Sequence, residues 1–391
     1  MPRIRHLLLL LLSLPLSACT AATESSPLPE EDVPAQMHLP ADRMIAAWIP
    51  YFSAERLLTA GEPQQAVSSY LQQLRDFGIN TVFVHAAAFG ESIYPSVYYP
   101  QLPALNGQDG LQIFSDACAE NQIALHAWIN PLRLQTGAVM ELQTGDAALC
   151  TWFKSSAFRS ANLNIWDGRY YLDPTTETTG KFLTGVVTEL MLRYHPAGIH
   201  ADDYFYPTTA PEFDADTFAA SGAADLGDWR RGHITALMQQ MYKAVHAADD
   251  HAVFSVSPQG DLQKNRDTLY ADVAAWCESG GCCDLVIPQL YYGYRHGRCP
   301  FAEMLRAWVM LPRSDAVQMA AGLGIYKYGQ TDPNAGSGAD EWCISEKLPA
   351  VQTEDVLTEP SLCGVAYYHA DALLELPGSE AAALKKASAQ H

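Results

Sequence analysis

Basic residues are scarce in this sequence, which contains 24 Lys and Arg against 44 Asp and Glu and carries a formal net charge of −20. Such an acidic chain is not expected to bind nucleic acids or anionic surfaces, because both are negatively charged and bind basic proteins. Neither the G-x-G-x-x-G motif nor the P-loop is present, which removes the main support for nucleotide binding. After residue 42 there is no further low-complexity stretch, and 48% hydrophobic residues are ample for one large core.

The start of the chain has the features of an export signal. Arg3 and Arg5 precede an apolar stretch, Leu7–Leu16, which is too short to span a bilayer as a permanent helix. The tetrapeptide Leu16-Ser17-Ala18-Cys19 resembles a bacterial lipobox, in which the cysteine is lipidated and becomes the new N-terminus. The alternative is an ordinary secretory peptide with an incidental cysteine. Both interpretations predict export, and the first adds a lipid anchor in a bacterial membrane.

We therefore divide the sequence into three parts. Residues 1–18 form the predicted signal peptide. Residues 19–42, rich in Ala, Thr, Ser, Glu and Pro, are predicted to be the lipidated cysteine and a flexible tether. Residues 43–391 form one predicted catalytic domain, a length that α/β barrels often reach as a single unit.

The cysteines predict disulfide bonds. Nine are present, and eight remain when Cys19 is set aside, an even number in an exported chain. Cys277, Cys282 and Cys283 lie close together in sequence, where a zinc site is the alternative. A disulfide is favoured there because a tetrahedral zinc site needs a second pair of ligands at a suitable spacing, and the sequence lacks one. The other candidates for pairing, with one another or with this cluster, are Cys299, Cys343 and Cys363.

Short apolar runs alternate with amphipathic helical stretches along the body of the chain. Eight runs are predicted strands: Met44–Pro50, Ile79–His85, Ile123–Ile129, Gly198–Asp202, Ala252–Ser257, Asp284–Leu290, Val317–Ile325 and Cys363–Tyr368. Apolar strands that alternate with helices are typical of a parallel sheet covered by helices. Eight of them in one body predict an α/β fold, a single closed (β/α)8 TIM-type barrel, rather than an open doubly wound sheet.

In such a barrel the functional site lies at the carboxyl ends of the strands and in the loops after them. Here those positions are rich in aromatic rings, amides and carboxyls. Rings stack on the apolar faces of sugars, and amides and acids bind their hydroxyls, so the composition predicts a carbohydrate site. The candidate substrate-binding residues are Trp48, His126, Trp128, Asn130, Arg133, Asp173, His200, Tyr204, Gln289 and Tyr291.

The strongest candidates for catalysis are Asp202 and Asp203, which end the fourth predicted strand. Removing an acidic pair from water is costly unless function or an ion pair requires it. Strand alternation places Asp202 on the same face as His200 and Tyr204. It places Asp203 on the opposite face, unless the chain turns where the strand ends. Asp202 is therefore the first choice; the alternative is that one of the pair caps the next segment or pairs with Arg133.

A glycosidase needs a second carboxyl within about 5–10 Å of the first. Glu91, after the second predicted strand, is the third catalytic candidate. Asp173 also qualifies, although Asp-Pro before a helix is equally well explained as an ordinary N-cap.

Four further candidates come from the end of the third predicted strand. His126 and Trp128 share an inward face, which predicts either the pocket floor or core packing. Asn130 and Arg133 are predicted ligand contacts. The long connection that follows, from Asn130 to about Thr178, would lie on the catalytic face of a barrel and is a natural substrate wall.

At these strand ends the sequence resembles the family-ten glycosyl-hydrolase-like proteins, many of which are bacterial lipoproteins. The matching segments are residues 126–133, 172–174 and 198–207, with weaker matches at 89–91, 94–96, 256–258 and 287–291. The resemblance implies a TIM-type barrel that hydrolyses glycosidic bonds, with cell-wall glycan a known substrate class. It supports as site positions Asn130, Arg133, Asp173, Asp202, Asp203 and Gln289.

The sequence departs from the family pattern at two places. After Ser257-Pro258 the family usually continues with Phe-Gly and then a tryptophan, whereas Gln259-Gly260-Asp261-Leu262 follows here, a change that bears on the substrate. Glu91 stands where the family commonly has Asp, which keeps a carboxyl.

The leading hypothesis is thus a glycoside hydrolase that cleaves a cell-wall (peptidoglycan-type) or other extracellular glycan by paired carboxylates, without a cofactor or metal. One alternative is a non-catalytic glycan-binding barrel. Another is a metal-dependent hydrolase, such as a deacetylase, with the two aspartates, His200 and His126 as ligands. A chitinase-type barrel is rejected, because Tyr204 stands where that barrel has its terminal catalytic acid.

Overall fold

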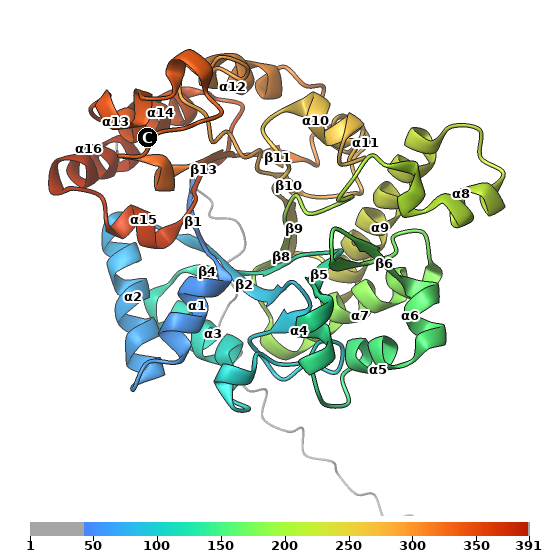
Figure 1. The fold of residues 1–391 in the computed structure, drawn as a ribbon. Coiled ribbons are helices and arrows are strands. Elements are labelled where there is room, and N and C mark those ends of the chain that lie inside the picture. The colour runs from blue at the N-terminus through green and yellow to red at the C-terminus, as the bar shows by residue number, and fades with distance from the viewer. Residues whose placement is uncertain (1–42, 390–391) are drawn as a thin grey trace, which may run out of the picture. The chain divides into compact units, whose positions relative to one another are not determined.

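The computed structural model describes residues 43–389, and parallel strands form its inner wall (Figure 1). The predicted signal peptide, the lipidation site Cys19 and the tether lie outside the described residues. The strands of the wall are β1 (Met44–Ile49), β2 (Thr81–Ala88), β4 (Ala124–Ile129), β8 (Gly198–Ala201), β9 (Val253–Val256), β10 (Leu285–Val286), β11 (Gln318–Met319), β12 (Ala321–Leu323) and β13 (Gly364–Tyr367). A short strand, β3 (Glu91–Ser92), pairs antiparallel with β2.

The wall closes on itself. Its strand order is β11-β10-β9-β8-β4-β2-β1-β13-β12, and only Ala320 separates β11 from β12. Because β11 pairs with β10 and β12 pairs with β13, these two pieces act as one strand that joins the ends of the sheet. Counted so, the barrel has the eight parallel strands that the apolar runs predict, and the TIM-type fold is confirmed.

Helices surround the wall (Figure 1). They are α1 (Tyr51–Leu58), α2 (Pro63–Phe77), α3 (Gly110–Asn121), α4 (Gly137–Leu142), α5 (Ala148–Lys154), α6 (Ser156–Asn162), α7 (Glu177–Tyr194), α8 (Ala215–Ser221), α9 (Leu226–Ala248), α10 (Leu262–Asp267), α11 (Val273–Ser279), α12 (Phe301–Val309), α13 (Glu341–Ile344), α14 (Leu348–Thr358), α15 (Ala370–Leu374) and α16 (Gly378–Ala389). Within residues 43–389, none of them is both long and apolar enough to cross a membrane.

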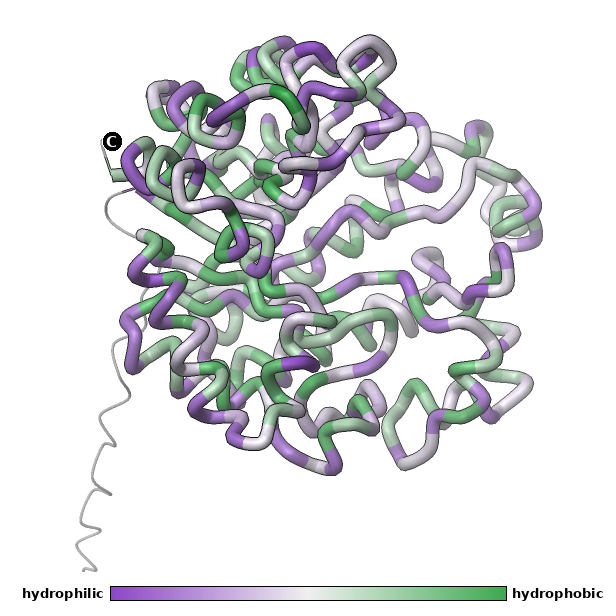
Figure 2. The backbone as a smooth tube through the Cα atoms, turned by 60° about the vertical axis from the view of Figure 1, so that its left-hand side comes forward, coloured by the Kyte–Doolittle hydropathy of each residue, from purple (hydrophilic) through white to green (hydrophobic). Residues whose placement is uncertain are grey.

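Helix α2 illustrates how sequence determines these elements. It begins at Pro63, whose fixed φ suits the first helical position. Val67, Leu71 and Leu74 recur at helical spacing and are buried against the wall. The helix ends at Gly78, whose φ of 106° is accessible to glycine but strained for other residues. Around the barrel, the tube alternates between hydrophilic and hydrophobic stretches, as amphipathic helices require (Figure 2).

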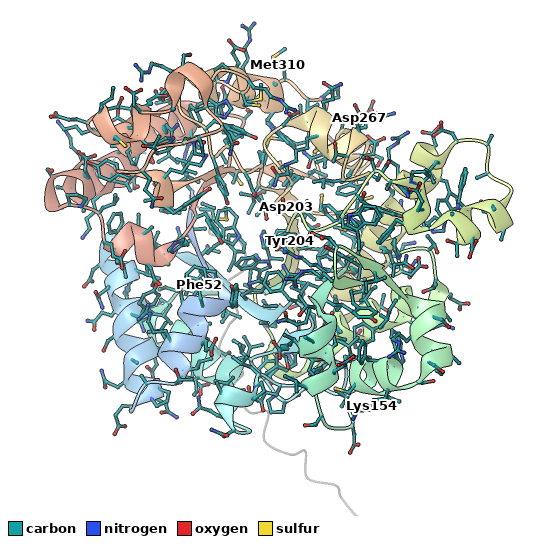
Figure 3. All side chains as sticks on the ribbon, in the orientation of Figure 1. Phe52, Lys154, Asp203, Tyr204, Asp267 and Met310 are labelled. Carbon is teal, nitrogen blue, oxygen red and sulfur yellow. The ribbon has the colours of Figure 1, made fainter. Side chains whose placement is uncertain are left out.

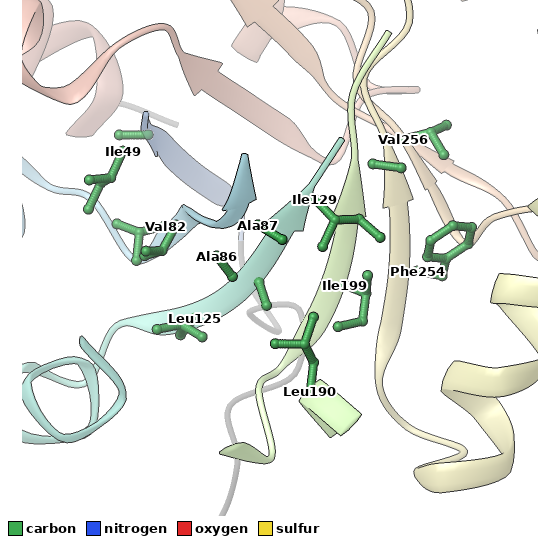
Figure 4. Packing of buried hydrophobic residues seen from close by; sticks show 14 of the residues in the cluster. Ile49, Val82, Ala86, Ala87, Leu125, Ile129, Leu190, Ile199, Phe254 and Val256 are labelled. Atoms are coloured by element: carbon green, nitrogen blue, oxygen red, sulfur yellow. The ribbon is translucent and has the colours of Figure 1, made fainter. Parts of the chain in front are cut away.

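The hydrophobic core has two layers, separated by the wall. In β1 the side chains of Met44, Ala46 and Trp48 point into the barrel, and the intervening residues point outward toward the helices. The outer layer is the larger, and Leu190 of α7 lies beside Ile199 of β8 within it (Figure 4). The inner layer includes two tryptophans near the carboxyl ends of the strands, which places a rigid aromatic floor beneath the barrel mouth.

The long connection after β4 has a structure of its own. It contains α4, α5 and α6 and a three-stranded antiparallel sheet in the order β5 (Arg133–Thr136), β7 (Arg169–Leu172) and β6 (Leu163–Trp166). This sheet forms no pair with the barrel wall.

The prediction of disulfide bonds is wrong for the described residues, in which all eight cysteines are free thiols. Six of them are buried, and only Cys343 is exposed. A buried thiol packs as a small apolar side chain, so the even number reflects core filling rather than cross-linking. Nor do Cys277, Cys282 and Cys283 form a zinc site: within residues 43–389 no three His, Cys, Asp or Glu side chains are placed to hold a metal ion.

Candidate active site

A pocket of about 320 Å³ opens at the carboxyl ends of the strands, where Asp203 and Tyr204 lie at the centre of the barrel mouth (Figure 3). This volume is at the lower end of the range for small-molecule sites. Its walls are aromatic rings, amides and two carboxyls. The lining residues are Trp48, Trp128, Asp202, Asp203, Tyr204, Ser257, Gln259, Gln289, Tyr291, Tyr292, Tyr326, Lys327 and Tyr368.

Asp202 is the more deeply buried of the two carboxyls, with an exposure of 3%. Its Oδ2 accepts hydrogen bonds from Trp128 Nε1, at 3.1 Å, and from Asn130 Nδ2. Its Oδ1 accepts one from the backbone N–H of Tyr204 at 3.3 Å. Burial, and then the neighbouring charge of Asp203, raise the pKa of Asp202 well above its usual value. This side chain is thus able to hold a proton at a pH where an exposed aspartate has lost it.

Asp203 lines the same pocket but is only half-buried. Gln289 Nε2 donates to its Oδ1 at 3.0 Å, and Gln259 Nε2 donates to its Oδ2. Lys264 Nζ in turn donates to Gln259 Oε1 at 3.1 Å and orients that amide. Strand alternation would have turned Asp203 away from Asp202, but β8 ends at Ala201 and alternation no longer applies. These two amides fix the orientation of the Asp203 carboxyl group within the pocket.

A buried chain of hydrogen bonds that the sequence did not reveal supports Asp202. The ring of His85 stacks on Trp128, with centroids 3.6 Å apart, and its Nε2 lies 3.0 Å from Asn130 Oδ1. The backbone N–H of Phe89 donates to the same oxygen at 3.0 Å. Because Asn130 Nδ2 donates to Asp202, Oδ1 is the acceptor and His85 Nε2 must carry the proton. Burial lowers the pKa of His85 to about 3, so the ring is neutral.

Two more histidines lie in the barrel interior beneath the pocket. Trp48 Nε1 donates to His200 Nε2 at 3.0 Å, and His200 Nδ1 lies 2.8 Å from Ser255 Oγ. Burial lowers the pKa of His200 well below its usual value, which keeps the ring neutral. One layer deeper, His126 packs on Phe83 with centroids 5.1 Å apart, and no described residue bonds to its ring nitrogens. Neither histidine lines the pocket, so they do not converge with the aspartates on a shared ligand position.

The remaining acidic candidates lie outside the pocket lining. Glu91 Oε2 accepts a hydrogen bond from Gln135 Nε2 at 3.0 Å, on the three-stranded sheet. Asp173 Oδ1 accepts from the N–H and the hydroxyl of Thr175, at 2.9 and 2.6 Å, which fixes the turn before α7. The N-cap of α7 is Thr176, whose side chain accepts from the N–H of Thr179, so Asp173 does not cap the helix.

Arg133 lies at the rim of the pocket, with its guanidinium carbon 4.3 Å from the centroid of the Tyr204 ring. Among the described residues it forms no ion pair with Asp202 or Asp203, so the acidic pair is not neutralised by this arginine. Of the other predicted binding residues, Trp48, Trp128, Tyr204, Gln289 and Tyr291 line the pocket.

The sequence analysis missed several lining residues: Ser257, Gln259, Tyr292, Tyr326, Lys327 and Tyr368. Tyr368 directly follows β13, so the rule that strand ends form the site could have found it. Tyr326 and Lys327 lie in a short 3₁₀ helix (Ile325–Lys327) after β12, where the same rule applies less directly. Gln259 had been noted only as a departure from the family pattern.

The comparisons with known proteins agree with this geometry. The sequence matches the family described as glycosyl hydrolase-like 10 over residues 43–335. It is 26% identical to the glycosyl hydrolase DigH of Escherichia coli (strain K12) over 347 residues, covering 79% of this chain and 76% of that protein. It is 22% identical to the glycosyl hydrolase YngK of Bacillus subtilis (strain 168) over 344 residues, covering 79% and 66% respectively.

Solved structures support the fold. The catalytic domain of a beta-amylase from Paenibacillus polymyxa superposes with a TM-score of 0.59 at 12% identity, covering 88% of this chain and 97% of that one. The glycoside hydrolase domain of PgaB (BpsB) from Bordetella bronchiseptica gives 0.57 at 14% identity, covering 89% and 99%. At such identities the likeness concerns the barrel alone. The family match and the named relatives confirm the resemblance found in the sequence and the enzyme class, glycoside hydrolase. The chain belongs to the glycosyl hydrolase-like 10 family.

Proposed function

We propose that this protein hydrolyses O-glycosidic bonds in a cell-wall, peptidoglycan-type glycan, with Asp202 and Asp203 as its catalytic carboxyls. The observation that carries the proposal is their difference in environment within one pocket: Asp202 is buried with a raised pKa, and Asp203 is half-exposed with an amide on each oxygen. Two carboxyls in unlike surroundings within one pocket, one of them able to hold a proton, are the arrangement that glycoside hydrolysis requires.

The two environments suggest a division of roles. Asp202 donates its proton to the glycosidic oxygen as the bond from that oxygen to the sugar carbon breaks. Asp203, as a carboxylate, acts from the other side of the reaction, on the sugar carbon or on the attacking water. Water supplies the hydroxyl of the new reducing end, and its remaining proton restores the acid. Glu91, engaged by Gln135, remains a predicted alternative for the second carboxyl.

The rings of the pocket fit a sugar. Trp48 and Trp128 lie at its floor, and Tyr291 and Tyr368 stand together at the wall with centroids 5.6 Å apart and planes 25° apart. Flat aromatic faces bind the apolar face of a pyranose, and the surrounding amides bind its hydroxyls. A glycan substrate therefore fits both the family and the pocket.

We further infer that the enzyme works outside the cytoplasm, held to a membrane by a lipid on Cys19. The proposal rests on the lipobox-like tetrapeptide and on a cell-wall substrate. Growth of the expressing bacterium with radiolabelled palmitate, followed by purification, tests it. Label on the wild type but not on Cys19→Ser supports the anchor, and label on neither contradicts it.

The reaction is tested by incubating the protein with peptide-free glycan strands from cell wall and with a panel of polysaccharides. New reducing ends are the measurement. We expect product from the cell-wall strands with the wild type, and none above background with Asp202→Asn. A matched control is Asp225→Asn, at the N-cap of α9, where asparagine caps equally well. Retention on a glycan column without product from any substrate would instead establish a non-catalytic glycan-binding barrel.

A further inference from the structure

Two arginines stand at the rim of the pocket on the three-stranded sheet. Arg133 begins β5, and Arg169 begins β7, its antiparallel neighbour. Both are half-buried. With Phe89 and Tyr204 they form a group that we call the rim cluster. Tyr204 also lines the pocket, so the cluster is continuous with the proposed sugar site.

Aromatic rings hold both guanidinium groups in place. The guanidinium carbon of Arg133 lies 4.3 Å from the centroid of Tyr204 and 4.9 Å from that of Phe89. That of Arg169 lies 5.8 Å from the centroid of Phe89. The two rings themselves meet edge to face, with centroids 5.9 Å apart. These cation–π contacts hold the two guanidinium groups next to Tyr204 and Phe89.

These cations have no carboxylate partner among the described residues, although the protein carries a net charge of −20. Arg169 Nη1 donates to the backbone carbonyl of Leu134 at 2.7 Å. Arg133 forms a side-chain hydrogen bond with Tyr204, and its Nε is removed from solvent without a hydrogen-bond partner. Glu91, which follows Phe89 closely in sequence, accepts from Gln135 instead. Two guanidinium groups close to the pocket that have no carboxylate to pair with are positioned to bind an anion.

We propose that Arg133 and Arg169 form a subsite for a carboxylate carried by a sugar next to the one in the catalytic pocket. The inference rests on the proposed hydrolysis of a glycan and narrows its substrate to an acidic one. A carboxylate fits because planar guanidinium groups bind it through paired, charge-assisted hydrogen bonds. Tyr204 lines the pocket and contacts Arg133, so the arginines lie next to the pocket rather than within it.

A carboxylate on a glycan has two common chemical sources, a uronic acid and a lactic acid joined to the sugar through an ether. Both present the same group to the arginines. Glycan strands that carry lactyl ethers and a uronic acid polymer are therefore tested side by side. The proposal requires that the enzyme prefers an acidic substrate. The polymer that is cleaved then shows whether the carboxylate comes from a uronic acid or from a lactyl ether.

The test compares an acidic glycan with the same glycan after its carboxyls have been reduced to alcohols. The kcat/KM on each is measured for the full chain as wild type, Arg133→Gln and Arg169→Gln. The matched control is Arg159→Gln, because Arg159 lies over the ring of Phe153 at 5.1 Å, on α6 rather than in the rim cluster. We expect the wild type to prefer the acidic glycan by about tenfold at low salt, and less at high salt, since the site is partly exposed.

The selectivity, rather than the rate, decides the outcome. Loss of the preference in Arg133→Gln or Arg169→Gln, through a larger fall of kcat/KM on the acidic glycan than on the reduced glycan, supports the subsite, provided that Arg159→Gln keeps the preference. An equal decline on both glycans would assign the arginines a purely structural role, and an undiminished preference would overturn the proposal as well. If no glycan is hydrolysed, the proposed function fails, and equilibrium binding of the two glycans to Asp202→Asn still tests the subsite: equal affinities refute it.

Discussion

Replacing Asp202 by Asn removes the titratable proton and changes few atoms. The side chain keeps its shape, and its oxygen can still accept the hydrogen bonds from Trp128 and Asn130. Only the longest of the three hydrogen bonds, from the backbone N–H of Tyr204 at 3.3 Å, is lost, because an amide nitrogen cannot accept it. If Asp202 is the general acid, kcat falls by about 10²–10⁴-fold, the usual contribution of such a group. The assay is release of reducing ends from peptide-free glycan strands, with kcat and KM measured separately. KM should change little, since binding by the rings and amides remains.

The same variant should be more stable than the wild type at neutral pH, because an ionised carboxyl is costly in this environment. The pKa of Asp202 is raised in the folded protein, so the folded state binds a proton more tightly than the unfolded state. Wild-type stability therefore falls as pH rises from about 4, the unfolded value, through the raised folded value. Asparagine has no such dependence. We expect a gain of about 1 kcal/mol at pH 7.5 that vanishes below pH 4.

Urea unfolding of both proteins across this pH range measures the difference. A variant that is less stable than the wild type by the same amount at every pH would refute the reasoning, since burial of the charge would then cost nothing. The control is Asp225→Asn, because its exposed side chain caps α9 and asparagine caps equally well. Loss of activity without the stability gain would support a catalytic role for Asp202 but contradict the electrostatic explanation.

Three further predictions concern other parts of the molecule. Asp214→Ala should lower the free energy of unfolding by about 3–5 kcal/mol in urea, because it strands Arg230, its partner at 2.5 Å in a fully buried ion pair. Gln259→Ala should reduce kcat by about tenfold without a change in thermal midpoint, since Asp203 loses one donor; an unchanged kcat would contradict this. Thiol titration without reductant should detect Cys343 first in the native protein, the half-buried Cys363 more slowly, and the six buried thiols only after unfolding; a total below eight for the described residues would indicate disulfides.

The fold could be predicted from the sequence because its determinants are local. Each barrel strand is a short apolar run, and each run is followed by residues with helical spacing, so counting the runs gives the eight strands. Asp202 could be predicted for the same reason: two acids that end an apolar strand are conspicuous wherever the strand lies. Trp128 and Gln289 followed from the rule that strand ends meet at the barrel mouth.

The remainder depends on contacts between distant parts of the chain. His85 appears in sequence as one polar residue in an apolar strand, and only the pairing of β2 with β4 brings it to Asn130. Gln259 reaches Asp203 from the loop after β9, the next strand of the barrel. The course of that loop does not follow from any pattern in the sequence. The disulfide prediction failed because an even number of cysteines does not show that any two of them lie close together in the fold.

The three-stranded sheet that carries Arg133 and Arg169 contributes no strand to the barrel and lies within a single connection between β4 and α7. Its exposed positions can therefore change while the wall that holds the two aspartates stays intact, whereas Leu134, Leu163 and Leu172 share the core of the wall and must stay apolar. Related enzymes could exchange this segment and acquire a new sugar preference while the reaction chemistry is inherited unchanged. For protein engineering, residues 133–172 are accordingly the first segment to transplant between relatives when a different glycan is to be cleaved.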